Sequence, residues 1–103
     1  MDVFRAAGAD LLIEAILSLK TEEECRSFLE DLMTGKEIQD CSQRILVAKL
    51  LREQMVYSRI AKVTGASSAT ISRVNRCYTY GAGGYRTVLN RLLGEPDSEE
   101  ANT

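Results

Sequence analysis

Two short helices joined by a tight turn are predicted within the segment YSRIAKVTGASSATISRVNR, residues 57–76. Helices that cross steeply need a small residue at the crossing and a turn residue that tolerates positive φ. Ala61 and Gly65, four residues apart, meet these two needs. Ile71 and Val74 lie one turn apart and can hold the second helix against the first. The spacing therefore predicts a helix-turn-helix.

The side of the second helix that points away from Ile71 and Val74 carries short polar and basic side chains. A helix-turn-helix presents the first turn of its second helix to base edges in the major groove. Hydroxyl and methyl groups there can approach base edges closely, while cations reach guanine or phosphate. The residues predicted to bind DNA are Ser58, Arg59, Lys62, Ser67, Ser68, Ala69, Thr70, Ser72, Arg73 and Arg76. The alternative is a well-capped turn between two core helices.

The rest of the chain is predicted to be helical, giving an all-α fold of about six helices. Capping boxes begin two of these helices at Thr21 and Thr34, each with a glutamate three residues later. The stretch ILVAKLL, residues 45–51, is apolar on almost every side, which favours a central helix, a dimer interface, or both. No run alternates as a strand does. The predicted helices cover residues 4–19, 22–33, 35–53, 57–63, 67–77 and 85–93.

One domain over residues 1–94 is predicted, because the 103-residue length fits a single domain. The glycine-rich stretch GAGG, residues 81–84, is interpreted as a helix stop and turn, with the tyrosines that flank it packing nearby. Residues 95–103, EPDSEEANT, have no large apolar side chain and are expected to be a disordered acidic tail.

Charge is distributed unevenly along the chain, although the net charge is only −2. Residues 1–40 carry a net charge of −6, residues 41–94 one of +8, and residues 95–103 one of −4. A strongly basic middle section favours a polyanionic partner such as DNA. The alternative is a solvated surface that keeps the protein in solution.

Several function classes are disfavoured by residues that the chain lacks. It has no histidine, and Cys25, Cys41 and Cys77 have no CxxC spacing, so neither a zinc site, nor a disulfide framework, nor any cofactor is expected. All three cysteines are expected to be buried or half-buried free thiols. No general base or nucleophile motif is present, and we do not expect an enzyme. Without a secretory leader or a membrane-length apolar run, the protein is expected in the cytoplasm.

The stretch LEDLMTGKEIQDCSQRILVAKLLREQMVYSRIAKVTGASSATISRVNR resembles the Trp repressor family. Its continuation, TGASSATISRVNRCYTYGAGGY, is similar to the YerC/YecD branch of that family. The resemblance covers about residues 20–93. It implies an intertwined, all-helical homodimer that binds double-stranded operator DNA, with one recognition helix per subunit in the major groove.

The resemblance also implies a ligand pocket formed by Thr34, Arg44, Arg73 and Cys77. Arg73 matches an arginine that helps hold the amino acid in tryptophan-binding members, and Thr34 matches a threonine beside that pocket. Val74 stands where those members have glycine, and Cys77 where they have serine. Tryptophan is therefore not the expected corepressor; a different small molecule, or none, is expected.

These observations predict a homodimeric, sequence-specific DNA-binding transcriptional regulator. Two other readings stay open. One is a dimeric protein-interaction module whose helix-turn-helix no longer reads DNA. The other is a regulator that senses a small ligand other than tryptophan.

Overall fold

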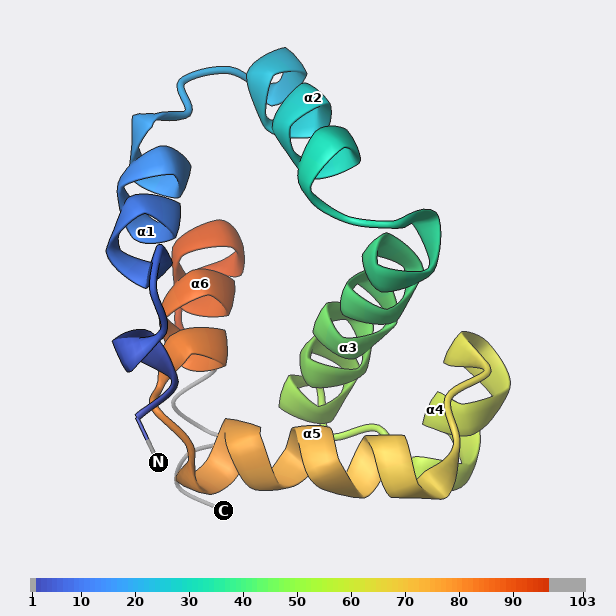
Figure 1. Cartoon of the computed structure of the whole chain (residues 1–103). Helices are drawn as coiled ribbons and strands as arrows, with labels where there is room; N and C mark the ends of the chain where they lie inside the picture. Colours follow the sequence, from blue (N-terminus) through green and yellow to red (C-terminus); the bar gives the residue numbers. More distant parts are fainter. Residues whose placement is uncertain (1, 97–103) are drawn as a thin grey trace. The chain divides into compact units, whose positions relative to one another are not determined.

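The computed structural model describes residues 2–96 and contains helices and no strand over that range. This confirms the predicted all-α fold of about six helices (Figure 1). A short 3-10 helix, η1, precedes the α-helices. The elements are η1 Val3–Arg5, α1 Ala9–Ser18, α2 Glu22–Leu32, α3 Gly35–Arg52, α4 Tyr57–Thr64, α5 Ser68–Tyr80 and α6 Gly84–Leu93. Most of the predicted acidic tail, residues 97–103, lies outside the described residues. The chain divides into two compact units, Met1–Ile38 and Gln39–Thr103.

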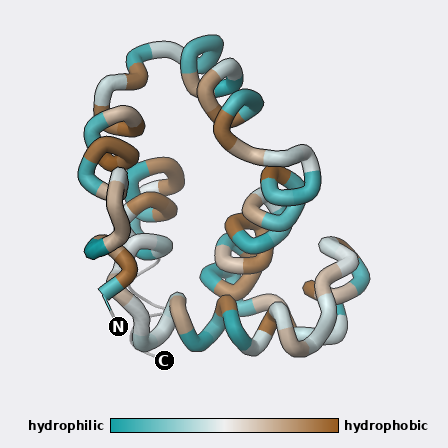
Figure 2. The backbone as a smooth tube through the Cα atoms, in the orientation of Figure 1, coloured by the Kyte–Doolittle hydropathy of each residue, from teal (hydrophilic) through white to brown (hydrophobic). Residues whose placement is uncertain are grey.

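In the first unit, the predicted helix over residues 4–19 is wrong at its start. Gly8 has φ +87° and separates α1 from η1, where Phe4 N donates to the Asp2 carboxylate at 2.9 Å. Along α1 the side chains of Leu12, Ile13 and Ile16 stay between 39% and 47% exposed. Figure 2 shows this run of hydrophobic residues along α1. Neither α1 nor α2 contributes a buried residue, so this unit has no closed core of its own.

Both capping boxes read from the sequence begin helices. Glu24 N donates to Thr21 Oγ1 at 3.1 Å, and the Glu24 carboxylate accepts from Lys20 N at 2.9 Å. At the start of α3, Glu37 N donates to Thr34 Oγ1 at 3.1 Å and Thr34 N donates to the Glu37 carboxylate at 2.9 Å. These bonds satisfy backbone N–H groups that have no partner inside the helix.

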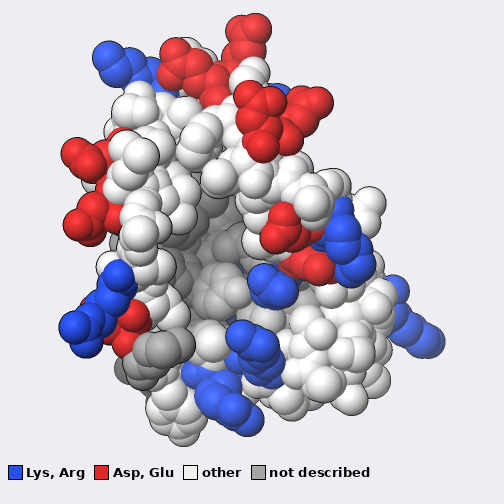
Figure 3. All heavy atoms as spheres, viewed as in Figure 1, with Lys and Arg blue, Asp and Glu red and all other residues white. Residues whose placement is uncertain are grey.

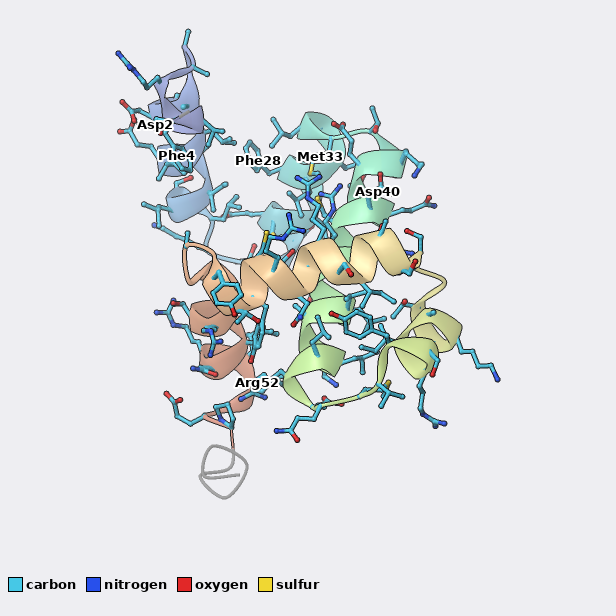
Figure 4. All side chains as sticks on the ribbon, turned by 90° about the horizontal axis from the view of Figure 1, so that it is seen from below. Asp2, Phe4, Phe28, Met33, Asp40 and Arg52 are labelled. Atoms are coloured by element: carbon cyan, nitrogen blue, oxygen red, sulfur yellow. The ribbon has the colours of Figure 1, made fainter. Side chains whose placement is uncertain are left out.

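The second unit is built around a core to which α3, α4, α5 and α6 all contribute. In Figures 1 and 4, α5 crosses α3, with α4 at one end of α5 and α6 at the other. The sequence predicted that Ile71 and Val74 hold the second short helix against the first, and both are 3% exposed or less. Ile60 of the first short helix is completely buried in the same core. The buried residues of the core are Val47, Ala48, Leu50, Ile60, Ala66, Ile71, Val74 and Leu89.

Arg52 joins the end of α3 to the end of α6. Its guanidinium Nη2 donates to the carbonyl oxygen of Gly94, and Figure 4 shows the side chain at the C-terminal end of α3. Gly94 N in turn donates to Asn90 O at 2.8 Å, which closes the last turn of α6. The two helix ends are thus joined by the side-chain hydrogen bond of Arg52 to a backbone carbonyl.

Helix α5 continues three residues beyond its predicted end at residue 77 and stops at Gly81. Thr79 and Tyr80 do not break a helix, whereas Gly81 leaves helical geometry at the C-cap with ψ −157°. Tyr78 and Tyr85 pack against the core, as expected for the tyrosines that flank the glycines. Tyr80 does not, because its side chain is 85% exposed.

Gly81→Ala is expected to destabilise the second unit. A Cβ atom at residue 81 would lie 2.3 Å from the carbonyl oxygen of Cys77, and that backbone atom can move away only by distorting α5. Forced contacts of this kind cost about 1–3 kcal/mol. Thermal unfolding followed by circular dichroism measures the change. Gly84→Ala is the matched control, since nothing lies within 4 Å of its Cβ and it begins α6 with ordinary φ. The control should be neutral or slightly stabilising, and equal losses in both variants would contradict the prediction.

Candidate nucleic-acid interface

The turn between α4 and α5 is held by hydrogen bonds around Thr64. Its hydroxyl donates to Ile60 O at 2.7 Å and accepts from Ala66 N at 3.1 Å. Gly65 has φ +74° at the C-cap of α4, as its place in the turn predicted, and its N–H donates to Ala61 O at 2.8 Å. The turn therefore has a defined geometry set by the Thr64 side chain and a left-handed glycine.

The first turn of α5 is capped by Ser67. Thr70 N donates to Ser67 Oγ at 3.1 Å, and Ser67 Oγ donates to Thr70 Oγ1 at 3.1 Å. These two hydroxyls, both predicted to meet DNA, are thus already bonded to each other. Ser68, Ala69 and Ser72 are exposed and make no described side-chain hydrogen bond. Three short, exposed side chains consequently lie within the first two turns.

Cations surround this surface. Arg73 and Arg76 are exposed further along α5, and Arg59 and Lys62 are exposed on α4. Residues 57–80 include these four cations and no carboxylate. Figure 3 shows Lys and Arg side chains over α5. A surface hollow of about 330 Å³ is lined by Val56, Ser58, Arg59 and Lys62.

The geometry joins an uncharged helix turn of short side chains to exposed cations on the same two helices. Short side chains allow the helix backbone to come close to base edges, which long side chains would prevent. Mobile cations at its border can each meet a phosphate oxygen and release condensed counterions. Such an arrangement is suited to the major groove of a duplex.

A second hollow, about 260 Å³ in volume, is lined by residues of α3, α5 and α6. Three of the four predicted pocket residues line it: Arg44, Arg73 and Cys77. The fourth, Thr34, belongs to the first unit, and its hydroxyl caps α3. The complete lining is Arg44, Thr70, Arg73, Val74, Cys77 and Tyr85.

The lining of this hollow suits an anion better than an amino acid. Arg44 and Arg73 offer guanidinium groups that match a carboxylate or phosphate. Burial raises the pKa of Tyr85, as does the nearby Cys77, while Arg44 opposes the shift; the phenol is therefore neutral at pH 7 and can donate. An ammonium group would need a strong acceptor, and the Cys77 thiol is a weak one. Among the lining residues, the two guanidinium groups therefore offer a stronger partner to the carboxylate of an amino acid than the thiol offers to its ammonium group.

Two of the cysteines differ from expectation. Cys25 is half-buried, but Cys41 and Cys77 are exposed in this chain, so the prediction of buried thiols is wrong for them. Cys77 follows Val74, a buried residue of α5, by three positions and lines the hollow.

Sequence reasoning missed two residues of this region. Tyr85 was expected only to pack, yet it also lines the hollow. Gln43 was not singled out, yet its side-chain amide donates to Thr64 O in the helix-turn-helix at 3.2 Å. The two partners are 21 positions apart, so no local spacing could have connected them.

Over residues 2–96, no helix combines the length and apolar character needed to cross a membrane.

Comparisons with known proteins agree on one family. The family model described as Trp repressor protein matches residues 7–93. The chain is 49% identical to the uncharacterized protein YerC of Bacillus subtilis, over 99% of this chain and 97% of that protein. Among solved structures, a TrpR-like protein from Eubacterium eligens is 48% identical, with a TM-score of 0.84, covering 91% of this chain and 97% of the other. A putative Trp repressor from Staphylococcus aureus is 40% identical, also with a TM-score of 0.84, over 94% and 100% of the two chains.

Proposed function

The chain belongs to the Trp repressor family, and from this premise we propose that it is a sequence-specific, DNA-binding transcriptional regulator. It acts as a homodimer that places one α5 helix per subunit in successive major grooves of a duplex. In a two-fold dimer the half-sites are about 34 Å apart, so the operator is nearly palindromic.

The observation that carries this proposal is the division of α5 into two faces. Ile71 and Val74 are buried at 0% and 3% exposure, which fixes one face against α3 and α4. The opposite face exposes Ser68, Ala69 and Ser72 to a partner. Because residues 57–80 contain no carboxylate, nothing on α4 or α5 would repel phosphate. The cations supply most of the affinity and the short side chains most of the specificity.

The proposed homodimer is supported by apolar surface that one chain leaves uncovered. The apolar stripe of α1, which includes Leu12, Ile13 and Ile16, is partly exposed. On α6, Val88 and Leu92 are 45% and 72% exposed. An apolar hollow of about 530 Å³ in the second unit includes Ile45, Tyr85 and Val88 in its lining. Exposed apolar side chains that lie together on a surface often mark a contact with another protein. A second copy of the chain would cover it.

A regulator that responds to a small ligand is the second candidate. The hollow between Arg44 and Arg73 supports it, since two guanidinium groups beside a neutral phenol suit a small anion. Thermal shift measurements with carboxylates and phosphates test this candidate. The result expected for a ligand-sensing regulator is a rise in melting temperature with one of these anions, and no such rise in Arg44→Ala.

Arg76→Ala is expected to weaken DNA binding and reduce its dependence on salt. If all four cations of each subunit meet phosphate, a dimer makes about eight contacts and loses roughly 10³–10⁵ in affinity between 50 and 200 mM salt. Arg76→Ala removes two of these contacts, so the slope of log affinity against log salt falls by about 2. Selection of bound fragments from a genomic DNA pool identifies the operator, and titrations at several salt concentrations give the slope.

Arg91→Ala is the matched control, because it removes the same charge from an exposed position on α6. We expect its slope to equal that of the wild type. If no sequence is enriched and binding is indifferent to Arg76, the helix-turn-helix does not read DNA. A protein-interaction module would then be the better account of the fold.

A further inference from the structure

We infer that Gln43 is a positioning residue for DNA reading, a role that rests on the proposed function. Its side chain ties the turn between α4 and α5 to α3. This hydrogen bond sets the position of the first turn of α5. That position decides which base edges Ser68 and Ala69 can reach. Gln43 itself touches no DNA in this scheme.

The tie is a single long-range hydrogen bond. Gln43 Nε2 donates to the carbonyl oxygen of Thr64 at 3.2 Å, and the contact is half-buried. Thr64 is the last residue of α4. Because the helix ends there, no backbone N–H of a further turn donates to the Thr64 carbonyl oxygen. The amide of Gln43 therefore takes the place of the N–H that the next turn of α4 would have supplied.

Thr64 also connects the Gln43 contact to the rest of the turn through its own hydroxyl group. Its hydroxyl bonds both Ile60 O, at 2.7 Å, and Ala66 N, at 3.1 Å. Ala66 is 5% exposed, so it cannot move without disturbing the core. Ser67, the next residue, caps α5. Four consecutive residues, 64–67, are thus fixed between the Gln43 contact and the first residue of the reading helix.

Helix α3 provides a rigid reference for this contact. Val47 and Ala48, one turn beyond Gln43, are both completely buried. Arg44, the next residue along α3, lines the hollow that it shares with Thr70 and Arg73 of α5. Two neighbouring residues of α3 therefore lie near the helix-turn-helix: Gln43 at the turn, and Arg44 near the first half of α5.

A purely structural role for Gln43 predicts something different. It would lower stability and weaken binding to every DNA sequence in the same proportion. A positioning role changes the placement of α5 within a folded protein. Phosphate contacts from flexible cations tolerate a small displacement, whereas base-edge contacts by short side chains do not. The ratio of specific to non-specific affinity separates the two roles.

The test compares Gln43→Met with the wild type. Methionine matches the length and flexibility of glutamine but has no amide to donate. Affinities for the selected operator and for a scrambled duplex are measured at one salt concentration, well below the melting temperature. Amide hydrogen exchange of the protein without DNA is followed by NMR. Gln39→Met is the matched control, one turn earlier on α3 and exposed.

We expect Gln43→Met to lower the ratio of specific to non-specific affinity about tenfold, since one neutral hydrogen bond is lost in each subunit. Exchange of the Gly65 and Ala66 amides should become about three- to tenfold faster, while both quantities stay unchanged in Gln39→Met. Unchanged exchange at the turn, or an unchanged affinity ratio, would overturn the inference. If the wild type binds no DNA, the proposed function fails instead, and the exchange data alone decide whether Gln43 holds the turn.

Discussion

Ile16→Glu is expected to convert the proposed dimer into a monomer with a lower melting temperature. Ile16 is 47% exposed in the single chain and stands in the middle of the α1 stripe, between Leu12 and Leu19. If a second chain covers this stripe, the new carboxylate is buried without a partner, at a cost of several kcal/mol. The melting temperature should fall by at least about 10 °C.

Sedimentation velocity over a range of protein concentrations measures the mass, and circular dichroism gives the melting temperature at each concentration. A dimer whose folding is coupled to association melts at higher temperature when more concentrated, and the variant should lose that dependence. Ile16→Leu, which keeps the volume and the apolar character, should remain dimeric. A wild-type monomer, or a variant that still sediments as a dimer, would show that α1 is not the interface.

The same variant should also lose operator binding, because a monomer offers only one recognition helix. Affinity for a palindrome depends on both half-sites being engaged together. Binding to non-specific DNA, which depends on counterion release at each subunit, should be affected far less. Dimerisation and DNA reading are therefore linked in the proposed dimer through the distance between its two α5 helices.

The helix-turn-helix could be predicted from the sequence because its determinants are local. Ala61, Gly65, Ile71 and Val74 lie within 14 positions, and each requirement is met by one residue type. Ser67, which caps α5, belongs to the same short segment. Spacing of this kind predicts how two adjacent helices cross, because each position has its own place in the motif.

Helix boundaries were harder to predict where the backbone conformation of one glycine separates or ends a helix. Apolar periodicity ran from Phe4 through Leu19, and nothing in it indicated that Gly8 would take φ +87° and split the segment. At its C-terminal end, α5 was predicted to stop at residue 77. The helix continues to Tyr80 because only Gly81 ends it.

Long-range contacts could not be predicted from one sequence at all. The Gln43 bond to Thr64 joins two helices across 21 positions. Arg44 and Arg73 were placed in one pocket by family resemblance, and the structure brings them together with Tyr85, a residue that the resemblance did not supply. Cys41 and Cys77 were expected inside because cysteine is usually buried, but that tendency carries no information about which side of a helix faces the core.

Ala69→Asp is expected to abolish operator binding while leaving the fold intact. Ala69 is exposed two residues after the Ser67 cap, in the turn that faces the bases. A carboxylate placed there faces the negative charge of the duplex, and close like charges cost several kcal/mol. The loss in affinity should be of order 10²–10³ at moderate salt.

The substitution should not destabilise the protein, because an acidic residue in the first turn interacts favourably with the helix dipole. The expected melting temperature is equal to or slightly above that of the wild type. Ala69→Asn adds a side chain of similar size without the charge and serves as the control; it should alter sequence preference more than total affinity. Fluorescence anisotropy with the operator and thermal unfolding together measure both quantities.

The combination of these results identifies what the α5 surface does. Lost binding with unchanged stability places Ala69 at the duplex, since neither misfolding nor loss of a cation explains it. Unchanged binding by Ala69→Asp would mean that this turn does not approach DNA, even if the cations of α4 and α5 still bind phosphate. In that case the buried face of α5 would remain a helix-turn-helix core, and its exposed face would serve a partner that tolerates negative charge.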